Sequence, residues 1–157
     1  MPFNPQPRVL CVDDDEDSRE MLSMLLKFWR IETKAVGTAT QALSLIQAER
    51  FDLYLLDTWL PDLDGLELCR RMRAFDPQTP ILFFSGAAYE ADKKRGIEAG
   101  ANAYVIKPDI DGLLGSVMQF VSHAASASAT QTMRAGGDVS IPPRLPLLKR
   151  SFSSLGG

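Results

Sequence analysis

The chain has 157 residues, of which 45% are hydrophobic and 24% are charged, and its formal net charge is −3. This length suits one domain with a substantial hydrophobic core. The charge is uneven, because residues 124–157 carry a balance of +3 and residues 1–123 a balance of −6. An acidic domain argues against direct nucleic-acid binding, since phosphate contacts require a basic face.

The cysteine content and the chain start give a first indication of the compartment. Cys11 and Cys69 are too few for a disulfide framework and are expected to be small core residues. No apolar stretch approaches the ~18 residues that suggest a membrane span. Residues 1–5 lack the basic and apolar regions of a signal peptide. We therefore expect a cytoplasmic protein.

Strand-like and helix-like patterns alternate five times along the chain. The expected strands cover residues 9–12, 32–36, 53–56, 81–84 and 103–106. Short apolar runs of this kind are typical of parallel strands that helices cover on both faces. Five strand–helix units predict an α/β fold with a doubly wound, five-stranded parallel sheet.

The first helix is expected to begin with Asp17 as its N-cap and Glu20 as the N3 partner. Helical spacing predicts that its apolar residues share a core face: Met21, Leu22, Leu25, Leu26, Phe28 and Trp29. Thr38 and Gln41 have the spacing of a capping box and predict the start of the second helix.

The fourth helix, roughly residues 89–99, is polar and contains Gly96. A glycine inside a helix costs about 0.8–1.0 kcal/mol relative to alanine, so we expect this helix to be the least stable. Gly100 suits its C′ position. The last helix follows residues 103–106 and has apolar residues at helical spacing: Leu113, Leu114, Val117, Met118 and Val121.

The composition changes after the last helix. Residues 124–157 are rich in Ala, Ser, Gly and Pro and are expected to be disordered. The predicted organisation is an N-terminal extension over residues 1–7, one domain over residues 8–123, and this tail.

Four of the expected strands end at polar residues. Asp13 and Asp14 follow the first strand, Asp57 the third, Ser85 the fourth and Lys107 the fifth. The carboxyl ends of parallel strands share one edge, where ligands bind. A carboxylate can attack phosphorus when the negative charges are neutralised, and Mg²⁺ binds carboxylates together with phosphate oxygens. The pattern predicts a Mg²⁺ site with a phosphoryl group that Ser85 and Lys107 contact.

Each of these features alone also has an ordinary structural interpretation. The acidic run at Asp13 is compatible with a solvated helix cap, Asp57 and Ser85 with turns, and Lys107 with an exposed loop. Their joint occurrence, each at the carboxyl end of a strand, favours the phosphoryl site.

Three segments resemble the signatures of response-regulator receiver domains. They are residues 12–15 (VDDD), 55–65 (LLDTWLPDLDG) and 104–108 (YVIKP). The resemblance covers about residues 8–122 and implies the flavodoxin-like, CheY-like fold with strand order 2-1-3-4-5. Because no helix-turn-helix or catalytic region follows, the sequence is interpreted as a single-domain response regulator of a two-component system or phosphorelay, with no output domain of its own.

The resemblance implies that Asp57 accepts a phosphoryl group from a histidine kinase or a histidine phosphotransfer protein. It also implies that Mg²⁺ is bound by Asp14, Asp57 and the backbone carbonyl of Trp59, with Asp13 acting mainly through water. Lys107 and Ser85 would stabilise the phosphoryl group.

The resemblance further implies a conformational switch in which Ser85 moves toward the phosphoryl group and Tyr104 follows. A half-buried strand tyrosine is the other interpretation of Tyr104. Trp59 and Ala87 occupy positions that in the family often carry polar groups influencing the access of water to the phosphoryl group. Since an indole and a methyl group orient water poorly, we expect a long-lived phosphate, although Trp59 is also compatible with a partner contact.

Three other functions are alternatives to the phosphoacceptor. A Mg²⁺-dependent phosphohydrolase with an aspartyl phosphate would need a second Asp at the position of Trp59. A flavin carrier would need a Ser/Thr/Gly-rich phosphate loop, where residues 13–17 are acidic. A receiver-like interaction module that is never phosphorylated is a further alternative. We expect a phosphoacceptor rather than an enzyme, with a downstream protein target, no direct nucleic-acid binding and the possibility of a phosphorylation-dependent dimer.

Overall fold

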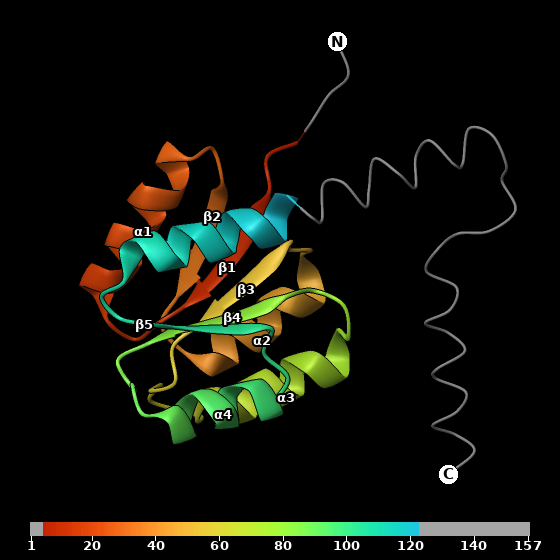
Figure 1. Ribbon diagram of the computed structural model, residues 1–157. Coiled ribbons are helices and arrows are strands. Elements are labelled where there is room, and N and C mark those ends of the chain that lie inside the picture. Colours follow the sequence, from red (N-terminus) through yellow and green to blue (C-terminus); the bar gives the residue numbers. More distant parts are fainter. Residues whose placement is uncertain (1–4, 123–157) are drawn as a thin grey trace, which may run out of the picture. The chain divides into compact units, whose positions relative to one another are not determined.

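The structure, a computed structural model, describes residues 5–122. Five parallel strands form one sheet in the order β2-β1-β3-β4-β5, which confirms the predicted fold (Figure 1). The strands are β1 (Arg8–Val12), β2 (Glu32–Val36), β3 (Leu53–Leu56), β4 (Ile81–Ser85) and β5 (Ala103–Ile106). The helices are α1 (Glu16–Phe28), α2 (Ala39–Ala48), α3 (Gly65–Phe75), α4 (Glu90–Glu98) and a last helix over residues 110–122.

The expected tail, residues 124–157, lies outside the described residues, so the predicted division of the chain into three parts stays a prediction. Between residues 5 and 122, no helix is both long and apolar enough to cross a membrane.

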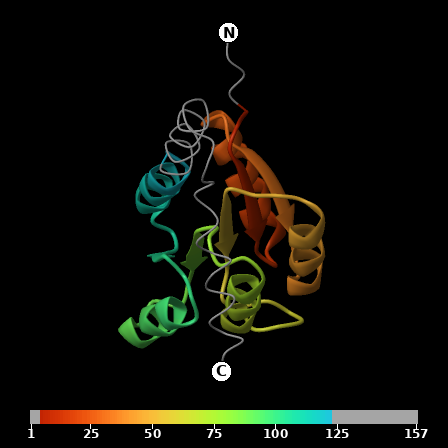
Figure 2. The same cartoon turned by 90° about the vertical axis from the view of Figure 1, so that its right-hand side faces the viewer.

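Helices cover both faces of the sheet, and two apolar clusters fill the space between them. Leu10 and Val12 of β1 pack toward α2 and α3, whereas Val9 and Cys11 pack toward α1 and the helix over residues 110–122. Successive strand residues point to opposite faces, which explains this division. Figure 2 shows the sheet between α2 and the last helix. Cys11 and Cys69 are both buried free thiols, as the sequence predicted.

Helix α1 differs from the prediction in its cap. The N-cap is Asp15, whose carboxylate accepts a hydrogen bond from the backbone N–H of Ser18 at 2.9 Å. The prediction of Asp17 was wrong because the run of acidic residues offers several side chains with the same capping chemistry. Asp17 lies inside the first helical turn, where a carboxylate still interacts favourably with the helix dipole.

The buried face of α1 is also narrower than predicted. Leu22 and Leu26, four residues apart, are its buried residues. Met21, Phe28 and Trp29 are 41%, 80% and 46% exposed. Positions four apart lie on one line of a helix, and the neighbouring apolar positions turn away from the sheet. The C-terminal half of α1 therefore presents apolar side chains to solvent.

Two predicted helix boundaries are confirmed. Thr38 is the N-cap of α2 and its hydroxyl accepts a hydrogen bond from the backbone N–H of Gln41 at 3.1 Å. Gly100, just after α4, has a φ of +120°, a conformation that L side chains rarely adopt.

Helix α3 begins against the end of β3. A Cβ on Gly65 would overlap the carbonyl oxygen of Asp57 and lie 2.7 Å from the Cα of Thr58. Glycine at this position allows the backbone of α3 to approach the residues that follow β3.

The loop between β3 and α3 is anchored to α2. The carboxylate of Asp62 accepts hydrogen bonds from the backbone N–H groups of Ala39 and Thr40, both at 2.9 Å, and from the hydroxyl of Thr40 at 2.6 Å. These bonds, led by the Thr40 hydroxyl, lower the pKa of Asp62 to about 2. Asp62 therefore satisfies free donors at the start of α2 and fixes the loop that leaves β3.

This contact predicts a pH-dependent contribution to stability. Since the folded-state pKa of Asp62 is lowered from 3.8 to about 2, its contribution is complete above pH ~4 and is lost as the pH falls toward ~2. Urea denaturation of wild type and Asp62→Asn at a series of pH values should show that wild type is the more stable protein near neutrality. The difference between their free energies of unfolding should decrease on acidification. A difference in the free energy of unfolding that stays constant down to pH ~2 would contradict the stabilising role of the Asp62 carboxylate.

Candidate functional site

The predicted polar residues meet at the carboxyl edge of the sheet. Asp13 follows β1, Asp57 follows β3, Ser85 ends β4 and Lys107 follows β5. Asp13, Asp57 and Ser85 are buried, and they are the polar or charged members of the buried set in the described chain. The backbone N–H of Asp57 donates to the carbonyl of Val12 at 2.9 Å, which fixes the end of β3 against β1.

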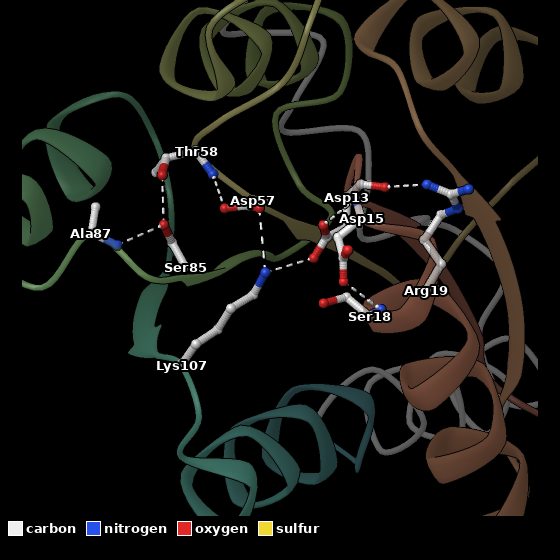
Figure 3. Close-up of polar contacts among 9 residues, drawn as sticks. All are labelled: Asp13, Asp15, Ser18, Arg19, Asp57, Thr58, Ser85, Ala87 and Lys107. Atoms are coloured by element: carbon white, nitrogen blue, oxygen red, sulfur yellow. Dashed lines mark hydrogen bonds and ion pairs between the residues drawn. The ribbon is translucent and has the colours of Figure 1, made fainter.

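Lys107 connects the two buried carboxylates (Figure 3). Its Nζ lies 2.8 Å from Oδ2 of Asp13 and 3.3 Å from Oδ2 of Asp57. Burial alone would lower the pKa of Lys107, but the two carboxylates together outweigh burial, and the pKa is raised. Lys107 is therefore a stable ammonium group shared by two acidic side chains.

The carboxyl group of Asp57 lies in an unfavourable place for a negative charge. Burial raises its pKa and the charge of Asp13 adds to this, while Lys107 and the backbone N–H of Thr58 act in the opposite direction. That N–H donates to Oδ1 of Asp57 at 2.7 Å. One ammonium group does not fully compensate the carboxylates gathered here.

Asp13, Asp14 and Asp57 could together hold a metal ion, because each offers a carboxylate oxygen within 4.8 Å of the others. Asp14 is exposed and the other two are buried. Carboxylate oxygens are ligands that Mg²⁺ prefers, and a Mg²⁺ ion usually keeps several waters beside one or two carboxylates. With Lys107 included, the four side chains retain an excess of negative charge, so this donor set fits a divalent cation.

Both oxygens of Asp13 have protein partners. Oδ1 accepts a hydrogen bond from the backbone N–H of Asp15 at 2.9 Å, and Oδ2 contacts Lys107. The guanidinium group of Arg19 donates to the backbone carbonyl of Asp13 at 2.8 Å. Sequence reasoning missed Arg19, because its spacing marked it only as a polar position of α1. Asp13 is held on both its side chain and its backbone.

Ser85 pairs with Thr58 rather than with Asp57. The two hydroxyl oxygens lie 2.5 Å apart, and Ser85 also accepts a hydrogen bond from the backbone N–H of Ala87 at 3.1 Å. Sequence reasoning missed Thr58. The register explains the contact, because Leu56 pairs with Phe83 and Thr58 therefore lies level with Ser85 two residues further on; no pattern within either strand indicates this register.

A chain of contacts leads from this pair to Tyr104. The phenol of Tyr104 donates to the carbonyl of Ala87 at 2.8 Å. Burial raises the pKa of Tyr104, and the nearby hydroxyls of Ser85 and Thr58 oppose that shift. These contacts connect four residues into one group, which we call the hydroxyl chain: Thr58, Ser85, Ala87 and Tyr104.

Gly96 makes room for Tyr104. A Cβ on Gly96 would lie 2.8 Å from the ring of Tyr104 and 3.2 Å from that of Phe83. Gly96 is the buried residue of α4. The glycine that the sequence marked as a weakness of α4 therefore has a packing role, since a larger residue would displace the tyrosine ring.

Trp59 lies next to the site and is 68% exposed. Ala87 takes part through its backbone N–H and carbonyl. The influence of these two side chains on the phosphate lifetime stays a prediction. The chemical roles of the other site residues stay predictions as well.

Comparison with known proteins gives consistent matches. The family description "Response regulator receiver domain" matches residues 9–118. The DNA-binding response regulator MtrA of Mycobacterium tuberculosis is 40% identical over 101 residues, which are 64% of this chain and 44% of that protein. The chain spans about half the length of the curated relatives it matches.

Solved structures agree with this match. A CheY-like receiver domain protein from Methanospirillum hungatei is 30% identical with a TM-score of 0.71, over 75% of this chain and 95% of that chain. The BeF3-activated receiver domain of RstA from Klebsiella pneumoniae is 26% identical with a TM-score of 0.69, over 73% of this chain and 97% of that chain. The chain therefore belongs to the response regulator receiver domain family of two-component signalling proteins.

Proposed function

We propose that this chain is a phosphoacceptor switch in which Asp57 receives a phosphoryl group from the phosphohistidine of a histidine kinase or a histidine phosphotransfer protein. The observation that carries the proposal is the buried carboxylate of Asp57, 3.3 Å from Lys107 Nζ and within 4.8 Å of the acidic groups of Asp13 and Asp14. Receiver domains are phosphoacceptors, so the protein takes part in its own phosphoryl transfer without turnover of a substrate.

In the proposed reaction, a carboxylate oxygen of Asp57 forms a bond to phosphorus. The P–N bond of the phosphohistidine breaks, and its electron pair returns to the imidazole nitrogen. Bound Mg²⁺ would neutralise negative charge on the carboxylates and the phosphoryl oxygens. Lys107 already faces Asp57 and would contact a phosphoryl oxygen, and the buried hydroxyl of Ser85 would donate to another.

The proposed metal ligands are Asp14, Asp57 and the backbone carbonyl of Trp59. Asp13 would act mainly through water, and its shorter contact with Lys107, 2.8 Å against 3.3 Å for Asp57, supports this division. Asp14 is exposed at the same place and is free to approach an ion from the solvent side.

The proposed response is a change in the surface formed by α4, β5 and the helix over residues 110–122. The hydroxyl chain supports this proposal, because it connects the neighbour of Asp57 to Tyr104, whose ring packs against α4 at Gly96. Phosphorylation would draw Ser85 toward the phosphoryl group, and Tyr104 would follow.

We further propose that the output passes through a downstream protein target, with a phosphorylation-dependent dimer as one form of that output. MtrA is named as DNA-binding, and the match to this chain covers 44% of that protein. The balance of −6 over residues 1–123 favours protein contacts over direct DNA contacts for that part.

Of two predictions about the proposed function, the first concerns the phosphoacceptor. Wild type incubated with a small phosphodonor and Mg²⁺ should gain one phosphoryl group by intact mass, because Asp57 is a buried carboxylate beside both Lys107 and the acidic groups of Asp13 and Asp14. The adduct should be absent in Asp57→Ala and after chelation of Mg²⁺.

Asp111→Asn is the matched control, because it removes an exposed carboxylate from the helix over residues 110–122; it should be phosphorylated like wild type. An adduct that persists in Asp57→Ala would overturn the assignment. Absence of an adduct on wild type, with Mg²⁺ binding shown separately, would favour the interaction module that is never phosphorylated.

The second prediction concerns the lifetime of the phosphate. Trp59→Asn should lose its phosphoryl group severalfold faster than wild type, because an amide can orient an attacking water and an indole cannot. The decay is followed by intact mass after removal of the phosphodonor. Trp29→Asn, a change of the other tryptophan at the end of α1, should leave the lifetime unchanged. Equal lifetimes for wild type and Trp59→Asn would refute the role of Trp59.

A further inference from the structure

Thr58 forms a hydrogen bond with Ser85, the residue whose hydroxyl group the proposed switch requires. The oxygens of Thr58 and Ser85 lie 2.5 Å apart, at the short end of the range for O–H···O hydrogen bonds. Figure 3 shows this contact between Ser85, the last residue of β4, and Thr58, which follows β3 and is next to Asp57 in the chain. Ser85 is fully buried, whereas Thr58 is half-buried.

The direction of this hydrogen bond follows from a count of protons. A serine hydroxyl has one proton and two lone pairs. Ser85 accepts the N–H of Ala87, and the hydroxyl of Thr58 is its nearest side-chain partner, at 2.5 Å. A fully buried hydroxyl without an acceptor is costly, and Thr58 is the partner with access to solvent for its own proton. This favours Ser85 as the donor and Thr58 as the acceptor, although either hydroxyl could donate on geometry alone.

We propose that Thr58 is a positioning residue that competes with the phosphoryl group for the proton of Ser85. This inference rests on the proposed function of Asp57. In the unphosphorylated protein, Thr58 accepts the proton; after phosphorylation, an oxygen of the phosphoryl group on Asp57 replaces Thr58 as the acceptor.

The competition extends along the hydroxyl chain. Ser85 also accepts from Ala87, and the carbonyl of Ala87 accepts from Tyr104. While Thr58 holds Ser85, the loop after β4 and the phenol of Tyr104 stay in the positions seen here. A phosphoryl group must therefore outcompete Thr58 for the proton of Ser85 before the surface at α4 changes.

The test uses beryllofluoride with Mg²⁺ as the probe of the phosphoryl-bound state, and its affinity is measured by isothermal titration calorimetry on the full chain. Thr58→Val keeps the branched shape but removes the acceptor, so Ser85 loses its partner only in the unliganded protein. The variant should bind beryllofluoride about fivefold more tightly than wild type, the scale of one hydrogen bond. Thr58→Ser keeps the hydroxyl and should bind like wild type.

A double-mutant cycle separates this role from a general structural effect. In a Ser85→Ala background, Thr58→Val should leave the affinity for beryllofluoride unchanged, because no serine proton remains to compete for. Thermal unfolding checks that each variant is folded, and Thr58→Ala replaces Thr58→Val if the latter is not.

Three results would overturn the proposal. In the first, Thr58→Val binds beryllofluoride no more tightly than wild type. In the second, Thr58→Val still increases the affinity for beryllofluoride in the Ser85→Ala background. Both leave the function of Asp57 intact if wild type binds the probe. Failure of wild type itself to bind beryllofluoride would count against the proposed function and, with it, against this inference.

Discussion

The contact of one ammonium group with two buried carboxylates is the interaction on which this site depends. Lys107 lies at the end of β5, whereas Asp13 and Asp57 lie at the ends of β1 and β3. In the strand order of the sheet, β4 separates β5 from β3. The side chain of Lys107 therefore crosses the end of β4, and its Nζ lies 5.8 Å from the centre of the ring of Phe84. The sheet topology and the long side chain of lysine together make the contact.

This contact leaves the site with unbalanced negative charge. A buried carboxylate is costly unless it is paired and hydrogen-bonded, and burial accordingly raises the pKa of Asp57. Lys107 compensates part of the charge, and Asp14 adds a further carboxylate at the solvent side. The fold thus maintains an electrostatic environment in which the proposed divalent cation and phosphoryl group would stabilise one another. The hydroxyl chain beside it connects Thr58 to Tyr104, whose ring packs against Gly96 of α4.

Much of the fold could be predicted from the sequence. The strands are short apolar runs between helical patterns, and their residues match the expected ranges to within one position. The shared edge of a parallel sheet then predicts that Asp13, Asp57, Ser85 and Lys107 meet. These inferences succeed because they depend on the alternation of strand and helix patterns, which the sequence shows directly, whereas the strand order came from the resemblance to receiver domains.

The details that depend on local competition or on contacts between strands were not predictable. Several acidic residues competed to cap α1, and periodicity alone did not reveal that Phe28 and Trp29 are exposed. The pairing of Thr58 with Ser85 depends on the register of β3 and β4. The role of Gly96 depends on the position of the ring of Tyr104, which no pattern within α4 indicates.

The most direct measurement of the central electrostatic claim is the affinity for Mg²⁺ of wild type, Lys107→Met and Asp57→Asn, by isothermal titration calorimetry. If Lys107 compensates the carboxylates that hold the cation, its removal should make Mg²⁺ bind severalfold more tightly. Removal of the charge of Asp57 should weaken binding. Weaker or unchanged Mg²⁺ binding by folded Lys107→Met would contradict the account, because it would show that the ammonium group does not balance the charge of the cation site.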